Sequence, residues 1–136
     1  MIFRLIIYGL LGWNLEVFWT GLGSLLKGDL NMMGHTSVWM FVIYGLSGIG
    51  FEFIHNKIKD KRWYERGLIW MYLIFAAELT SGALLALFDI HPWEYDGTFA
   101  LFGLIRLDYA PVWFSVGLIF ERVHSFLTDV QLARRG

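Results

Sequence analysis

Residues Gly67–Phe88 form an apolar run with a single ionisable side chain, Glu78, near its middle. At about 1.5 Å per residue, a helix of this length crosses a hydrocarbon core of about 30 Å. A carboxylate at mid-depth costs about 2.5–3.5 kcal/mol on insertion scales, so such side chains rarely face lipid without a partner. The run therefore predicts a membrane-spanning helix that packs against other helices carrying partners for Glu78.

The composition of the whole chain also indicates a membrane protein. Of its 136 residues, 57% are hydrophobic, and the mean hydropathy is +0.52. A water-soluble domain of this composition would have too little polar surface to cover itself, and the length fits one domain, residues 1–136. The net charge of −1 gives no reason to expect a nucleic-acid partner, and the absence of cysteine removes disulfides and thiolate ligands.

Four apolar segments predict an all-α protein, a four-helix transmembrane bundle that crosses the membrane several times. The segments cover about residues 2–26, 37–56, 67–88 and 109–127. The hydroxyls of Thr36 and Ser37 are suited to cap the second helix, and Pro111 falls in the first turn of the fourth, where proline is tolerated. The first segment has no small-residue cleavage site, so we interpret it as a retained helix and not a signal peptide.

The distribution of basic residues predicts the orientation of the spans. Nine of the eleven Lys and Arg residues lie near the chain ends or in the connector Lys57–Arg66, and Lys27 and Arg106 fall on the other side. Cytoplasmic loops of membrane proteins carry an excess of basic residues. We therefore expect an integral, multi-pass membrane protein with both termini in the cytoplasm and the loop 89–108 outside.

Each predicted span carries one glutamate, and these four are Glu16, Glu52, Glu78 and Glu121. The glutamates share a helix face with small residues: Gly9 and Gly12 precede the first, and Gly45 and Gly48 precede the second, at spacings of three or four. Small residues allow membrane helices to approach closely. We therefore expect the four carboxylates to face the interior of the bundle as a buried polar cluster.

Two of the spans contain a Glu-x-x-His pair, whose members lie on the same helix face. Combined with one glutamate on each of the other two helices, this is the ligand pattern of di-iron carboxylate bundles. The six candidate ligands are Glu16, Glu52, His55, Glu78, Glu121 and His124. Such a set suits two divalent ions of iron, manganese or zinc. The same side chains are also compatible with a hydrogen-bonded network that only fixes the packing, or with histidines that face lipid headgroups.

Several short motifs follow one another along nearly the whole chain. They include Gly12-Trp13-x-x-Glu16-Val17, Thr36-Ser37-Val38-Trp39, Glu78-x-Thr80-x-Gly82, Pro92-Trp93-Glu94-Tyr95 and Trp113-Phe114. In these motifs the chain resembles the animal transmembrane protein 229 family and, more loosely, bacterial proteins labelled as ABC-transporter permeases. The resemblance implies a multi-pass membrane protein, and the four glutamates match the pattern of the animal family. The sequence has no Gly-x-x-x-x-Gly-Lys-Ser/Thr motif, so any use of ATP would need another subunit.

These observations lead to three functional hypotheses. The leading one is a small permease-like membrane protein whose four glutamates handle protons or cations, with no cofactor expected. The second is a membrane-embedded di-metal binding protein or enzyme that uses the same glutamates with His55 and His124. The third is a structural or assembly subunit without chemistry. Because four spans enclose little volume, a transport path favours a homo-oligomer or a partner subunit in the lipid bilayer.

Overall fold

The computed structural model describes residues Met1–Gly136 and is built from helices. The elements are α1 (Ile2–Leu26), α2 (Val38–Ile58), α3 (Trp63–Ala86), β1 (Ala100–Leu101), β2 (Ile105–Arg106), the 3-10 turn η1 (Leu107–Tyr109) and α4 (Ala110–Ala133). By length and composition, α1, α2 and α3 are candidate membrane spans. The predicted all-α class and the membrane character of the chain are therefore confirmed.

The predicted helices agree with the structure in number and position, and two of their starts were anticipated in detail. α1 has the predicted bounds, whereas α2 begins one residue later and ends two residues later than expected. Ser37 Oγ accepts a hydrogen bond from the backbone N–H of Trp39 at 3.2 Å, so Ser37 caps α2 as predicted. Pro111 lies in the first turn of α4, also as predicted.

Helix α3 begins at Trp63, four residues before the predicted start. Its start is fixed by Glu65, whose Oε2 accepts a hydrogen bond from the backbone N–H of Arg62 at 2.9 Å. This bond satisfies one of the donors that a helix start leaves free, and the carboxylate suits the positive end of the helix dipole. The predicted helix, which was defined by the apolar run beginning at Gly67, therefore left out the first turn of α3, because that turn is polar although it is helical. The connector between α2 and α3 is correspondingly shorter than predicted.

Helix α4 continues to Ala133, six residues beyond the predicted end at Leu127. The segment 128–133 is mixed polar and apolar, and it contains neither glycine nor proline that would end a helix. Thr128 Oγ1 donates to the backbone carbonyl of His124 at 2.9 Å within this last part. Because a span was predicted from continuous apolar character, the amphipathic extension was missed.

The chain forms two compact units, and the first, Met1–Phe51, contains α1 and most of α2. Glycines bring these two helices together. A Cβ atom added to Gly9 would lie 2.7 Å from the ring of Phe41, and one added to Gly48 would lie 2.5 Å from the ring of Tyr8. A Cβ atom at Gly12 would overlap Tyr44 in the same way. The prediction that these glycine stripes face a neighbouring helix is confirmed within this unit.

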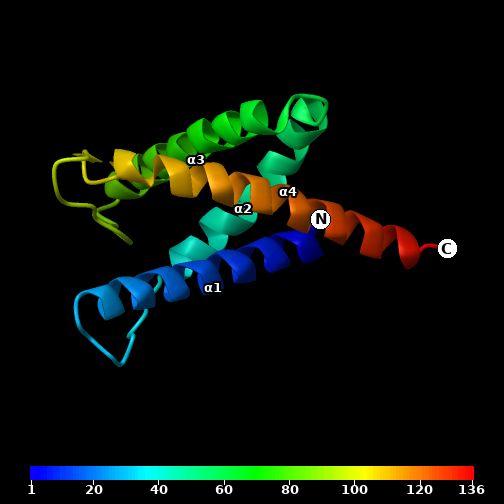
Figure 1. Cartoon of the computed structure of the whole chain (residues 1–136). Helices are drawn as coiled ribbons and strands as arrows, with labels where there is room; N and C mark the ends of the chain where they lie inside the picture. The colour runs from blue at the N-terminus through cyan, green and yellow to red at the C-terminus, as the bar shows by residue number, and fades with distance from the viewer. The chain divides into compact units, whose positions relative to one another are not determined.

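The second unit, Glu52–Gly136, is centred on α3 and α4, which lie side by side (Figure 1). The two helices run antiparallel: Trp70 near the start of α3 lies against Gly117, and Glu78 further along α3 bonds Trp113 near the start of α4. A Cβ atom at Gly117 would overlap the side chain of Trp70, which is fully buried. Glycine is therefore required here for the close approach of the two helices.

A compact loop joins α3 to α4. Asp89, three residues beyond the last residue of α3, has a φ of +59, a left-handed conformation that is common where a helix ends. Strands β1 and β2 then pair antiparallel across a tight turn in which Phe102 and Gly103 have φ values of +55 and +69. The backbone N–H of Tyr95 donates to Gly103 O at 2.9 Å, so the hairpin positions the Tyr95 side chain next to α3.

Large apolar side chains are exposed along the helices. Phe18, Leu46, Tyr72, Leu84 and Ile119 are between 57% and 68% exposed. Monomeric water-soluble proteins rarely leave contiguous apolar surface of this kind uncovered. Side chains of this type are instead suited to contact acyl chains, which agrees with the predicted lipid bilayer environment.

Candidate functional site

In the first unit, Glu16 is bonded to the segment that precedes α2. Its Oε2 accepts a hydrogen bond from Thr36 Oγ1 at 2.8 Å. Further bonds join the same segment to α1. Among them, Thr20 Oγ1 accepts from His35 N at 2.8 Å, and Trp13 Nε1 donates to Ser37 O at 2.8 Å. Glu16 therefore takes part in a local network that fixes the start of α2 against α1.

Two aromatic side chains of the second unit bond Glu78, and a third packs against both of them. Glu78 Oε1 accepts from the Tyr95 hydroxyl at 3.0 Å, and its Oε2 accepts from Trp113 Nε1 at 3.2 Å. The ring of Tyr109 is perpendicular to both of these rings, with its centroid 5.6 Å from that of Tyr95 and 6.1 Å from that of Trp113 and interplanar angles of 89° in both cases. We call Glu78, Tyr95, Tyr109 and Trp113 the Glu78 aromatic cluster.

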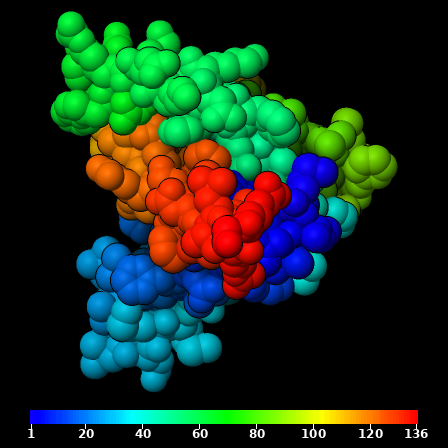
Figure 2. Space-filling model, turned by 90° about the vertical axis from the view of Figure 1, so that its right-hand side faces the viewer, coloured from blue at the N-terminus to red at the C-terminus, as the bar shows by residue number.

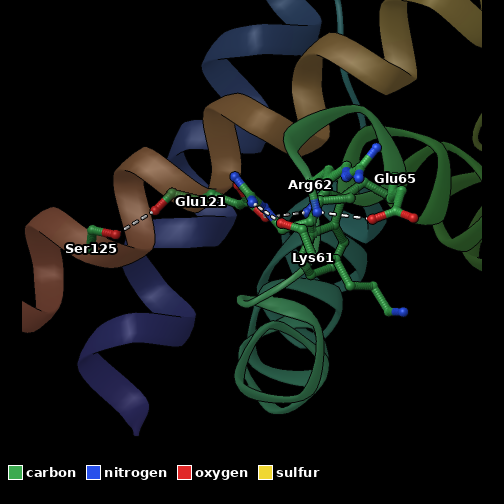
Figure 3. Close-up of polar contacts among 7 residues, drawn as sticks. Lys61, Arg62, Glu65, Glu121 and Ser125 are labelled. Carbon is green, nitrogen blue, oxygen red and sulfur yellow. Dashed lines mark hydrogen bonds and ion pairs between the residues drawn. The ribbon is translucent and has the colours of Figure 1, made fainter.

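Glu121 on α4 faces the start of α3 and carries a different set of partners. Arg66 Nε donates to both of its carboxylate oxygens, at 2.9 and 3.1 Å, and Trp70 Nε1 donates to Oε1 at 2.8 Å. Arg66 also donates from its terminal nitrogen to Lys61 O at 2.6 Å, which ties the connector to the same site. Figure 3 shows Glu121 pointing toward the connector residues Lys61 and Arg62.

The two Glu-x-x-His pairs meet at a third site. His124 Nδ1 lies 3.2 Å from Glu52 Oε1, and these side chains are 13% and 18% exposed. The His55 ring packs edge-on against the His124 ring, with centroids 4.9 Å apart, and Phe120 stacks parallel to His124 at 6.1 Å. His55 Nδ1 is buried without a hydrogen-bond partner. We call Glu52, His55 and His124 the histidine cluster.

The structure thus distributes the glutamates of the second unit over three clusters. Glu78 lies eight residues beyond Trp70 on α3, so its cluster is about 12 Å further along the helix than that of Glu121. No group of three or more His, Asp or Glu side chains is placed to hold a metal ion. One reason is that Glu121, a ligand in the di-metal hypothesis, binds a guanidinium and an indole with both oxygens. The side-chain arrangement therefore gives no support to the two-metal alternative.

Several side chains that bond the glutamates were not among the sequence candidates. Arg66 was interpreted as a marker of the cytoplasmic boundary, and Trp70 as part of an apolar run. Tyr95 and Trp113 occur in the motifs that carry the family resemblance, which was the one sequence signal for them. The pairing of these residues depends on how α3 and α4 align, and no local pattern in the chain encodes that alignment.

The connector between α2 and α3 forms an exposed basic surface beside these sites. In Figure 2 it appears in green and borders the orange surface of α4. Lys59, Lys61 and Arg62 in this connector are exposed, as expected for a segment in water or among lipid headgroups.

Comparison with known proteins identifies no family for the chain. No protein-family model matches it, and no solved structure matches it significantly.

Proposed function

We propose that the protein is an integral membrane protein with four spans, in which α4 crosses the membrane together with the three candidate spans. α4 is 24 residues long, as long as α3, and packs along it through Gly117. Its Ile119 and Phe126 are 60% and 65% exposed, seven positions apart on one face. Those side chains are suited to lipid, whereas Trp113 and Glu121 are buried on the other face.

With four spans, the basic residues favour an orientation in which both termini lie in the cytoplasm. The connector Lys57–Arg66 holds five of the eleven Lys and Arg residues and would lie on the same side as the termini. The α3–α4 loop with its hairpin would then lie outside. This orientation follows from the bias that places basic loops in the cytoplasm.

The function that the geometry favours is the handling of protons by the histidine cluster. The observation that carries it is the contact of 3.2 Å between His124 Nδ1 and Glu52 Oε1 in a largely buried position. A carboxylate on Nδ1 orients the imidazole and stabilises its protonated form. His55 adds a second imidazole against the first, and its Nδ1 has no hydrogen-bond partner and is therefore available to accept or release a proton. Imidazole changes its charge near neutral pH, and ionisable side chains inside membranes commonly form proton relays.

We propose that the histidine cluster handles protons as part of a transport activity. The chain resembles permease-labelled membrane proteins, and movement of protons across the membrane would use ionisable side chains of this kind. Four helices enclose little volume, so we propose that the path lies between copies of the chain or between the chain and a membrane partner.

The proposal is tested by proton flux into vesicles that contain the purified protein and an internal pH-sensitive dye. With an imposed membrane potential, the wild type should acidify the vesicles faster than empty vesicles. Both His124→Ala and Glu52→Gln should slow the flux by about tenfold or more, because each removes one side of the pair. His91→Ala is the matched control, since His91 lies exposed in the α3–α4 loop.

Two results would overturn the proposal. One is a wild-type flux equal to that of empty vesicles across a range of imposed potentials. The other is a flux of wild-type size in His124→Ala protein that shows the unchanged helical circular dichroism spectrum.

A further inference from the structure

We propose that the β1–β2 hairpin of the α3–α4 loop is a lipid-contacting element. Its exposed aromatic side chains, Phe99 and Phe102, enter the lipid leaflet in which α3 ends, at the boundary between acyl chains and headgroups. The inference is independent of proton handling and uses one part of the proposed function, the crossing of the membrane by α3. It rests on four observations: the place of the hairpin beside α3, the strain of its turn, the apolar surface around it, and the pairing of its backbone.

The first observation is that the turn of the hairpin packs against the last turn of α3. A Cβ atom added to Gly82 would lie 2.8 Å from the Leu104 side chain and 3.1 Å from that of Trp93. Gly82 is four residues before the end of α3 at Ala86, so this contact lies about 6 Å inside the helix end. Part of the loop is therefore level with a helix that is a candidate membrane span.

The start of α4 leads to the same conclusion. Trp113 on α4 bonds Glu78 on α3 at 3.2 Å. α4 begins at Ala110, about 4.5 Å before Trp113, whereas α3 continues to Ala86, about 12 Å beyond Glu78. α3 therefore extends past the level at which α4 begins, and the hairpin lies beside this extension.

The second observation is the turn itself, which presents an aromatic side chain in a strained backbone conformation. Phe102 and Gly103 have φ values of +55 and +69, and the backbone N–H of Leu104 donates to Leu101 O at 3.0 Å to close the turn. Glycine and asparagine suit such a position, whereas a bulky side chain is strained there. Phe102 is 87% exposed, so packing within the chain does not offset the strain. A contact outside the chain accounts for an aromatic residue at this position.

The third observation identifies lipid as that contact. Phe99 is 56% exposed, and Leu87 and Phe88, which directly follow α3, are 80% and 71% exposed. These side chains continue the apolar surface that α3 presents at Leu84, which is also exposed. Because acyl chains cover the exposed apolar face of a membrane span, the same lipid leaflet covers its continuation on the hairpin.

The fourth observation is the pairing of the hairpin backbone. Lipid offers no hydrogen bonds, so a non-helical segment at membrane depth needs partners within the protein. β1 and β2 pair with each other. In the turn, Gly103 O accepts from the backbone N–H of Tyr95 at 2.9 Å. Leu104 O accepts from Trp93 Nε1 at 3.0 Å, so the polar groups that lie nearest α3 are bonded and the aromatic side chains can enter lipid.

Electron paramagnetic resonance of nitroxide labels tests the proposal in vesicles of palmitoyl-oleoyl phosphatidylcholine. The chain has no cysteine, so single cysteines can be placed and labelled at positions 99, 102, 98 and 72. Collisions with oxygen, which concentrates among acyl chains, are compared with collisions with a water-soluble nickel chelate. The labels at Phe99 and Phe102 should give an oxygen-to-nickel ratio severalfold higher than the label at Thr98, an exposed polar position of the same loop.

The label at Tyr72, which is exposed near the middle of α3, distinguishes the two proposals. A water-like ratio at position 72 would show that α3 does not cross the membrane, which overturns the four-span topology and the hairpin inference together. A lipid-like ratio at 72 with values at 99 and 102 equal to that at 98 would overturn the hairpin inference alone. Few collisions with both reagents at 99 and 102, with dipolar broadening between labels, would assign the surface to a second copy of the chain and would also overturn it.

A variant with the nitroxide at position 99 tests the role of Phe102 directly. Phe102→Asn keeps a residue that suits the left-handed turn and removes the aromatic ring. The oxygen-to-nickel ratio at 99 should fall severalfold, toward that at 98, because the hairpin loses its contact with lipid. Met33→Asn, at a 67% exposed apolar position of the α1–α2 loop, is the matched control and should leave the ratio unchanged. An unchanged ratio in Phe102→Asn would contradict the proposal.

Discussion

The Nε atom of Arg66 on α3 donates to both carboxylate oxygens of Glu121 on α4, at 2.9 and 3.1 Å. Trp70 Nε1 donates to the same carboxylate at 2.8 Å, so one glutamate joins two side chains of α3 that are one turn apart. Arg66 is 22% exposed and Glu121 is 10% exposed at the side chain. A pair with so little access to water is costly to break on one side, because the remaining charge stays buried.

This relationship predicts the outcome of a double-mutant cycle. Arg66→Met should lower the free energy of unfolding by about 3 kcal/mol, because Glu121 then keeps a buried charge without its cation. Adding Glu121→Gln should recover more than half of that loss, since the amide oxygen can still accept from Trp70 and carries no charge. Unfolding by titration with a denaturing detergent measures both effects.

Arg62→Met is the control for this cycle, because Arg62 lies next to the same connector but is exposed. Its effect should stay within about 0.5 kcal/mol. Strictly additive losses in the double variant would show that the two side chains are not coupled.

The helices of this chain could be predicted from sequence because crossing a membrane sets a minimum length of apolar chain. A helix end that depends on apolar character alone is predicted correctly, as at Leu26 of α1. The predicted helix ends differ from the structure where polar residues determine them. Glu65 satisfies the start of α3, and the mixed segment 128–133 prolongs α4 without any apolar run.

The sequence identifies the glutamates and histidines of the candidate site, but it does not predict which of these side chains contact one another. The Glu-x-x-His pattern identified Glu52 and His124, but their contact joins one motif to the other. Which glutamate meets which donor depends on the alignment of α3 and α4, and that alignment is set where Gly117 admits Trp70. Such a fit between two distant segments leaves no periodic signal in either of them.

The glycine stripes of the first unit predict opposite effects for two neighbouring glycines of α2. A Cβ atom at Gly48 would lie 2.5 Å from the Tyr8 ring, whereas a Cβ atom at Gly50 would meet nothing within 4 Å. Gly48→Ala should therefore destabilise the protein by about 1–3 kcal/mol through overpacking. Gly50→Ala should be neutral or stabilise by up to about 1 kcal/mol, because alanine favours the helix.

Thermal unfolding in detergent compares these two variants, which carry the same added methyl group two residues apart. A more severe change, Gly48→Leu, should prevent proper packing, whereas Leu46→Ala on the exposed face should be tolerated. Equal midpoints for Gly48→Ala and Gly50→Ala would mean that the stripe does not pack against α1.

The proposed four-span topology is tested by labelling of single cysteines, which is direct because the chain has none of its own. Cysteines at Lys59, Thr98 and Arg135 lie in the connector, in the α3–α4 loop and after α4. An impermeant maleimide added to intact cells should label only position 98. Labelling of 98 and 135 together would show that α4 does not cross, and labelling of 59 and 98 together would show that α3 does not.

The last prediction concerns metal. Both oxygens of Glu121 bond Arg66, and Glu78 lies about 12 Å further along α3 than the Glu121 site. No group of three or more His, Asp or Glu side chains is placed to hold a metal ion. We therefore expect iron, manganese and zinc to be well below one ion per chain in protein purified without chelator, as measured by plasma mass spectrometry. Added zinc should not raise the thermal midpoint of the wild type, because a ligand stabilises a fold only when the folded state binds it. Two ions per chain, lost in both His124→Ala and Glu121→Gln, would instead establish the di-metal alternative and require Arg66 to leave Glu121.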